Sequence, residues 1–274
     1  MKLGVIVSLN SDDIDSKFKE VYNYGFKYCQ ITVWQEKYMT DEIAKKIIAA
    51  CKKYEIEIST LWCGWSGPKK WNFYEGNLTL GLVPTAYRFE RMKDLMRGSD
   101  FAKKLGVSKI ATHVGFIPED PNSQVYKEVI IAIKAVADYC KENGQLFLFE
   151  TGQETPVTLL RAIEEIGNDN LGINLDPANL IMYGKGNPID AIDVFGKYVR
   201  DVHAKDGLYP TSGKLLGKEV KVGSGKVNFP YLLKALRLVG YDETLIIERE
   251  ISGDEQIKDI IDTKKYLEEL LSDQ

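Results

Sequence analysis

The chain has 274 residues, of which 44% are hydrophobic and 28% charged, a composition typical of an ordinary globular protein. The formal net charge of -4 and the scattered Lys and Arg residues disfavour nucleic acid as a main partner, because phosphate binding needs concentrated positive charge. The sequence contains no apolar run long enough for a membrane span, and its first ten residues are typical of a strand rather than a signal peptide. Its four scattered cysteines fit reduced thiols, so we expect a cytoplasmic protein with no membrane partner.

Short apolar segments alternate with helical patterns along the whole chain. The segments are rich in Ile, Val, Leu and Phe and often continuous, which is typical of strands buried on both faces of a parallel sheet. Helix signals between them include Thr40 as an N-cap, Pro84 in a first turn and a last helix over roughly 254–271. The expected strands cover residues 3–8, 27–33, 57–62, 108–113, 145–150, 171–176, 198–203 and 244–249.

Eight strand–helix units in a chain of this length predict an α/β protein, a closed (β/α)8 TIM barrel in which residues 1–274 form a single domain. A doubly wound open sheet is the structural alternative, but no G-x-G-x-x-G fingerprint follows the first strand. Two connections, 63–83 and 204–227, are longer than a barrel requires. Both follow strand C-termini, where barrel active sites are built. The aromatic connection 63–83 could serve as a lid or as the contact of a homo-oligomer.

Three acids and one histidine end the last four expected strands. The motifs FLFETG, INLDPAN, DVHAKD and LIIERE place Glu150, Asp176, His203 and Glu248 there, and the chain has only two histidines in all. In a barrel these side chains converge, and carboxylates with one imidazole suit a divalent metal ion. Mn²⁺ is the favoured ion, with Co²⁺, Mg²⁺ and Zn²⁺ as alternatives. A lone acid at a strand end is more often a helix cap or a surface charge, but four such residues on successive strands favour a metal site.

The motifs that carry these residues resemble those of the xylose isomerase-like TIM-barrel superfamily, which includes sugar phosphate isomerases and epimerases. The resemblance runs over nearly the whole chain and rests on THVGF, FETGQE, NLDPANL, VHAKDG, VGSGKVNFPYLL and IERE. It implies a single Mn²⁺-type ion held by Glu150, Asp176, His203 and Glu248. In the epimerase branch Glu150 and Glu248 also serve as the proton-transfer pair.

Two positions depart from other branches of this superfamily. Endonuclease IV-like nucleases bind three zinc ions through extra histidines, but this chain has Asn179 and Glu219 where two of those histidines are expected. The nuclease reading is therefore disfavoured. Ketose 3-epimerases often have a substrate-binding histidine at the position of Asn179. Asn179 could still bind a sugar hydroxyl, but the identity of the sugar stays undetermined.

Several other polar residues are expected at the same mouth of the barrel. His113 follows the fourth strand and is interpreted as a substrate contact, with a structural role as the alternative. Lys205 and Asp206 directly follow His203, where they could reach the substrate or brace the metal ligands. Glu154 could support Glu150, but its place before the next helix favours a cap.

Aromatic and loop residues complete the candidate substrate site. Trp34, Trp62 and Trp65 follow the second and third strands and could line the apolar face of a sugar, or they could belong to the core. Glu219 on the long connection is a weaker candidate. The segment 223–226, Gly-Ser-Gly-Lys, could hold a substrate phosphate or simply form a turn.

The chemistry that suits this site is proton abstraction next to a carbonyl. The hypothesis is a sugar or sugar-phosphate isomerase or epimerase in which the metal stabilises an enediolate and Glu150 and Glu248 lie on opposite sides of the substrate. A lyase that dehydrates a keto-polyol, similar to inosose dehydratase, is the alternative on the same scaffold. A non-catalytic sugar-binding barrel is less favoured, because binding alone does not need a second carboxylate base.

Overall fold

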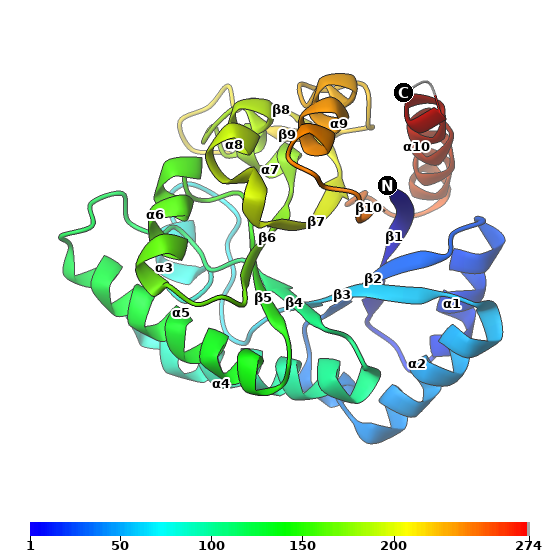
Figure 1. Ribbon diagram of the computed structural model, residues 1–274, viewed down its shortest axis with the longest axis horizontal. Helices are drawn as coiled ribbons and strands as arrows, with labels where there is room; N and C mark the ends of the chain where they lie inside the picture. The colour runs from blue at the N-terminus through cyan, green and yellow to red at the C-terminus, as the bar shows by residue number, and fades with distance from the viewer. Residues whose placement is uncertain (273–274) are drawn as a thin grey trace.

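The computed structural model describes residues 1–272 of the chain, and the parallel strands in this range close into a barrel. Helices cover the outer face of the barrel (Figure 1). The predicted TIM-barrel fold is confirmed, and the expected strands agree with the observed ones to within one or two residues at each end. In their order around the barrel the strands are β1 (Lys2–Leu9), β10 (Thr244–Ile247), β7 (Val199–Ala204), β6 (Leu171–Leu175), β5 (Leu146–Glu150), β4 (Lys109–Thr112), β3 (Glu57–Cys63) and β2 (Tyr28–Val33).

The helices begin and end at capping residues of the types that the sequence predicts. Thr40 caps α2 by accepting a hydrogen bond from the Ile43 amide, and Gly106 ends α4 in the left-handed region. No helix among residues 1–272 is both long and apolar enough to cross a membrane. The helices are α1 (Ile14–Asn23), α2 (Asp41–Tyr54), α3 (Gly76–Thr79), α4 (Thr85–Leu105), α5 (Gln124–Glu142), α6 (Pro156–Ile166), α7 (Pro177–Met182), α8 (Pro188–Phe195), α9 (Phe229–Leu238) and α10 (Asp254–Ser272).

The barrel interior holds a polar network below its C-terminal mouth, whereas the layer between strands and helices is apolar. Asp201 lies in β7 and is fully buried. Its carboxylate accepts hydrogen bonds from Ser59 (2.9 Å), Thr60 (2.6 Å) and Thr244 (2.7 Å). A buried carboxylate is tolerated when its oxygens are satisfied in this way. Successive side chains of a strand alternate in direction, so Asp201 and His203 face the interior together.

A side chain of α4 holds the connection after β3 in place. The guanidinium of Arg91, fully buried, donates to the carbonyl oxygens of Ser66 (3.0 Å), Pro68 (2.8 Å) and Gly81 (2.7 Å). One side chain thus satisfies carbonyl groups from both ends of the loop that spans 63–83. This hydrogen bonding gives the loop a defined shape without regular secondary structure at its ends.

The connection after β7 contains a short antiparallel hairpin that the sequence did not indicate. It is formed by β8 (Asp206–Leu208) and β9 (Lys218–Val220). The tip of this connection meets the aromatic connection, since the Phe73 amide donates to the Lys214 carbonyl oxygen at 3.4 Å. The two long connections therefore touch each other beside the mouth of the barrel.

Candidate metal centre and active site

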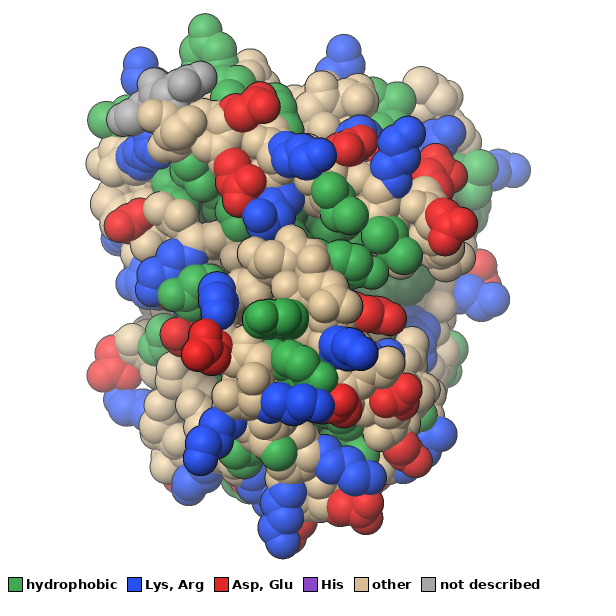
Figure 2. Space-filling model, turned by 90° about the vertical axis from the view of Figure 1, so that its right-hand side faces the viewer, with side chains coloured by type: hydrophobic (Ala, Val, Ile, Leu, Met, Phe, Trp, Pro, Cys, Tyr) green, Lys and Arg blue, Asp and Glu red, His purple; other side chains and the backbone are tan. Residues whose placement is uncertain are grey.

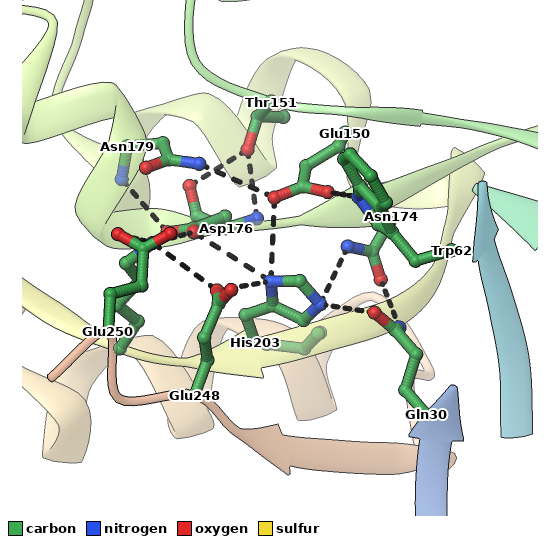
Figure 3. Close-up of polar contacts among 12 residues, drawn as sticks. Gln30, Trp62, Glu150, Thr151, Asn174, Asp176, Asn179, His203, Glu248 and Glu250 are labelled. Carbon is green, nitrogen blue, oxygen red and sulfur yellow. Dashed lines mark hydrogen bonds and ion pairs between the residues drawn. The ribbon is translucent and has the colours of Figure 1, made fainter. Parts of the chain in front are cut away.

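Four potential metal ligands meet at the C-terminal mouth of the barrel (Figure 3). Glu150 is the last residue of β5, Asp176 follows β6 and caps α7, His203 lies in β7, and Glu248 follows β10. One ligand atom from each lies within 4.8 Å of the others. Glu150, Asp176 and His203 are buried, and Glu248 is partly exposed. The structure thus brings together the residues that the sequence assigned to one site.

The atoms that face the centre of this cluster fit a cation. His203 Nδ1 lies 3.0 Å from Glu248 Oε2, 3.5 Å from Glu150 Oε1 and 3.7 Å from Asp176 Oδ2. Among the described residues, Nδ1 of His203, Oδ2 of Asp176 and Oε2 of Glu248 have no hydrogen bond. Buried polar atoms are normally hydrogen-bonded, so a group of such atoms pointing at one spot indicates a ligand that they share. Three carboxylates and an imidazole are the donors of a divalent ion such as Mn²⁺, Mg²⁺ or Zn²⁺.

The polar network of the barrel interior orients the histidine for this task. Gln30 donates its amide hydrogens to Asp201 Oδ2 (3.3 Å) and Asn174 Oδ1 (3.2 Å), which fixes the direction of the Gln30 amide. Gln30 Oε1 then lies 2.8 Å from His203 Nε2, and Asn174 Nδ2 lies 3.0 Å from the same nitrogen. Because a carbonyl oxygen only accepts, the shorter contact gives Nε2 a proton that it donates to Gln30, and the Asn174 amide then makes no hydrogen bond to this nitrogen. Nδ1 is then the nitrogen whose lone pair can bind a metal.

Lys205 neutralises part of the negative charge around the cluster. This lysine is only 2% exposed, and its Nζ lies 3.5 Å from Asp176, 3.3 Å from Glu248 and 3.1 Å from Glu250. Burial lowers the pKa of Lys205, but the surrounding carboxylates outweigh burial and hold it well above its usual value. Lys205 was expected either to reach the substrate or to brace the ligands. Its position fits both roles, since it lies against the candidate ligands and also in the wall of the cavity.

The two glutamates of the cluster differ in their affinity for a proton. Burial raises the pKa of Glu150 to about 8. Burial also acts on Glu248, but Lys205 and His203 outweigh it and hold the pKa of Glu248 below its ordinary value. Two carboxyl groups whose environments separate their pKa values in this way are the usual signature of an acid–base pair.

A cavity of about 760 Å³ opens beside the ligand cluster, and its wall contains most of the expected substrate contacts. Trp62 donates its indole N–H to Glu150 Oε2, and its ring lies 4.9 Å from that of Trp34. His113 Nε2 lies 3.4 Å from Glu150 Oε1, and burial lowers the pKa of His113 to about 4, so this imidazole is neutral at pH 7. The expected residues in the wall are Trp34, Trp62, His113, Asn179 and Lys205, besides Glu150, His203 and Glu248.

Trp65 and Glu219 lie outside this wall, contrary to the sequence-based expectation. Trp65 is 1% exposed, donates to the carbonyl oxygen of His113 at 3.3 Å and stacks on the Arg91 guanidinium at 4.2 Å. It therefore belongs to the core that anchors the aromatic connection. Glu219 pairs with Arg249 at 3.0 Å and accepts the Glu250 amide at 3.1 Å, so it positions the segment after Glu248.

Asp206 also lies outside the wall of the cavity, and its contacts explain the Gly-Ser-Gly-Lys segment. Its carboxylate accepts backbone amides of Gly207 (2.8 Å), Gly223 (3.0 Å), Gly225 (2.9 Å) and Val227 (3.1 Å). A Cβ atom on Gly225 would lie 2.1 Å from Asp206 Oδ1, so glycine is required there. The amides that could have held a phosphate are occupied by this carboxylate, and the phosphate cradle considered for this segment is not formed.

Glu154 is not the helix cap that the sequence favoured. Thr155 caps α6 by accepting the Thr158 amide. Glu154 is 2% exposed, and neither of its carboxyl oxygens has a hydrogen-bond partner within residues 1–272. Burial raises the pKa of Glu154 to about 8, so its carboxyl group stays protonated at neutral pH.

The sequence analysis missed the polar residues that lie below the four candidate ligands in the barrel interior. Gln30, Asn174 and Asp201 are single polar residues inside the apolar strands YCQITV, LGINL and VRDVHA. A polar residue in a strand buried on both faces is the signal that could have identified them.

A family model described as xylose isomerase-like TIM barrel matches residues 18–270 of the chain. A xylose isomerase domain protein from Planctomyces limnophilus has a similar crystal structure, with 34% identity, a TM-score of 0.92 and coverage of 98% of this chain and 96% of that chain. An uncharacterised protein from Methanocaldococcus jannaschii is 26% identical over 99% of this chain and 89% of its own length. The structure of a D-tagatose 3-epimerase-like protein shares the fold at 21% identity and a TM-score of 0.78, covering 99% of this chain and 97% of the other.

The buried Glu154 generates a prediction about stability. Replacing Glu154 with Gln should stabilise the protein more at pH 8 than at pH 5, by about 3 kcal/mol. The carboxyl group of the unfolded chain ionises near its ordinary pKa of 4.5, whereas the folded protein keeps it protonated up to a pKa of about 8. The contribution of the protonated Glu154 carboxyl group to the free energy of unfolding is therefore fully present below pH 4.5 and is lost as the pH rises through 8. Urea unfolding across this pH range measures the difference, and the exposed Glu164→Gln is the matched control.

The contact between Gln30 and His203 generates a prediction about metal affinity. Gln30→Leu should weaken binding of Mn²⁺ by about 10- to 100-fold, because Nε2 loses the acceptor that keeps Nδ1 free. Isothermal titration calorimetry measures the affinity, with the thermal midpoint as a check on folding. Thr60→Val is the matched control, since it removes a hydrogen bond to the same Asp201 without touching His203. Equal loss of affinity in both variants would show that the network acts only through stability.

Proposed function

This chain belongs to the xylose isomerase-like TIM-barrel family, and we propose that it is a divalent-metal-dependent sugar isomerase or epimerase. The observation that carries the proposal is the pair Glu150 and Glu248, which converge with Asp176 and His203 on one spot at the wall of the cavity. The epimerase-like neighbour supports a sugar as the substrate class. Mn²⁺ is the ion we favour for this set of donors.

The proposed reaction removes a proton from a carbon next to a carbonyl group. A divalent ion held by Glu150, Asp176, His203 and Glu248 would supply Lewis acidity toward the carbonyl oxygen of the sugar. Glu248, the glutamate with the lowered pKa, begins as a carboxylate and removes the proton. Glu150 would serve as the acid that returns a proton to the intermediate. Delivery to the opposite face of the same carbon inverts it. Isomerisation results if Glu248 returns the proton to the neighbouring carbon while the hydroxyl proton moves to the former carbonyl oxygen.

Residues around the pair would bind and orient the sugar. Lys205 is charged, and His113 and Asn179 are neutral donors or acceptors suited to hydroxyl groups. The rings of Trp34 and Trp62 offer an apolar surface for the C–H face of a sugar. Trp62 also donates a hydrogen bond to Glu150, so it orients one of the two acid–base groups.

Solvent exchange tests the proposed reaction. The Mn²⁺-loaded protein is incubated in D₂O with a panel of free and phosphorylated ketoses, and proton spectra follow the exchange. We expect deuterium at C3 for an epimerase, or at C1 or C2 for an isomerase. Glu150→Gln and Glu248→Gln should each slow exchange by about 10²- to 10⁴-fold, because each removes an acid–base group.

The exposed Glu164→Gln is the control and should exchange at the wild-type rate. Full activity of either active-site variant would contradict the two-carboxylate mechanism. Loss of water from a keto-polyol instead of exchange would identify the lyase on the same scaffold. Tight Mn²⁺ binding without exchange of any substrate would favour a sugar-binding barrel without turnover.

A further inference from the structure

The cavity at the metal ligands does not end at the barrel mouth. The same cavity of about 760 Å³ that is lined by Glu150, His203 and Glu248 is also lined by residues of two outer helices. These are Val21 of α1, the C-cap residue Tyr24 that follows it, and Ile257 and Ile260 of α10. The cavity therefore runs from the reacting centre to the space between α1 and α10.

The strand register explains how the cavity passes the barrel wall. Val5 of β1 pairs with Ile247, the last residue of β10, whereas β1 continues to Leu9. After Ile247 the chain stays hydrogen-bonded to β7, since the Glu248 amide donates to the Ala204 carbonyl oxygen at 3.3 Å. Residues 6–9 of β1 thus have no β10 partner within the described chain, and the barrel is open sideways between β1 and residues 248–253.

The outer part of this cavity, which we call the lateral crevice, is lined by Val5, Val21, Tyr24, Ile257 and Ile260. Figure 2 looks onto this side of the molecule and shows a hollow with hydrophobic side chains around it. Lys17 and Glu20 stand at its rim with opposite charges, and Gln256 is neutral. An apolar crevice without excess charge suits an uncharged apolar group and disfavours a phosphate or a carboxylate.

We propose that the substrate is a keto sugar whose anomeric oxygen carries an apolar aryl or alkyl aglycone. The proposal rests on the proposed function for its sugar half, which lies at Glu150 and Glu248. The aglycone leaves the barrel between β1 and residues 248–253 and lies in the lateral crevice against Val21 and Ile260. The meeting of the two long connections at Phe73 and Lys214 is compatible with this sideways route, since it leaves the β1 side open.

Phenyl β-D-glucopyranoside is the probe, and methyl β-D-glucopyranoside is its matched partner. Neither has the reactive carbonyl, so neither is consumed. The phenyl glycoside should bind about 10- to 100-fold more tightly, because its ring is buried in the crevice. In spectra of the Mn²⁺-loaded protein, compared with the Mg²⁺-loaded protein, the paramagnetic ion should broaden the sugar protons more than the phenyl protons. Equal affinity of the two glycosides, or stronger broadening of the phenyl protons, would overturn the proposal.

Two variants test the location of the aglycone. Ile257→Glu places a charge in the crevice at a position that is 37% exposed, and Ile257→Trp fills the crevice from α10. Each should abolish the preference for the phenyl glycoside and leave Mn²⁺ affinity and methyl glycoside binding unchanged. Ile131→Glu, at a side chain of α5 that is 70% exposed, is the control and should keep the preference. A preference that survives in Ile257→Glu, folded by its thermal midpoint, would contradict the assignment.

The results of these experiments distinguish a failure of the aglycone proposal from a failure of the proposed reaction. Exchange of ketose protons in D₂O without any phenyl preference would overturn the aglycone assignment alone. A phenyl preference that the crevice variants abolish, without any exchange, would keep the crevice and overturn the reaction. Sedimentation that shows a dimer disrupted by Ile257→Glu would assign the crevice to a second copy of the chain and overturn the proposal.

Discussion

Repulsion among buried carboxylates is the constraint on which this site depends. Glu150, Asp176 and Glu248 place oxygen atoms within 4.8 Å of one another, and Glu150 and Asp176 are buried. Such an arrangement needs positive charge or protonation. Lys205 supplies part of that charge, and burial still holds the pKa of Glu150 above its ordinary value. A divalent cation would complete the balance, so the same electrostatics that bind a metal also set the proton affinity of the two glutamates.

The polar network of the barrel interior holds His203 in a defined orientation toward the acids. Asp201 is held by hydroxyl groups from β3 and by Thr244 at the start of β10, and through Gln30 of β2 it determines which nitrogen of His203 faces the acids. The network thus connects strands from opposite sides of the barrel at the level below the ligands. Fixing a histidine through its second nitrogen is a common way to support a metal ligand.

The sequence predicted the barrel and the convergence of four candidate ligands because both depend on local signals. An apolar run followed by an acid or histidine fixes the strand end, and the barrel fold brings such ends together. The failures concern residues whose partners are distant in sequence. Nothing near Asp206 indicates that the amides of Gly223, Gly225 and Val227 fold back onto it. Gln30 was missed because one polar residue in a strand does not reveal what it contacts across the barrel interior.

The position of Glu248 after β10 has a consequence for the order of assembly. Among the described strands β10 is the last to be synthesised, and its pairing with β1 closes the barrel. Glu150, Asp176 and His203 can approach one another on adjacent strands before β10 is in place, but Glu248 joins them only when β10 pairs with β7. A divalent ion bound by all four side chains would therefore require β10 in place, and an intermediate with β10 detached would offer an incomplete set of donors. Refolding followed by metal uptake would show the last step of barrel formation directly.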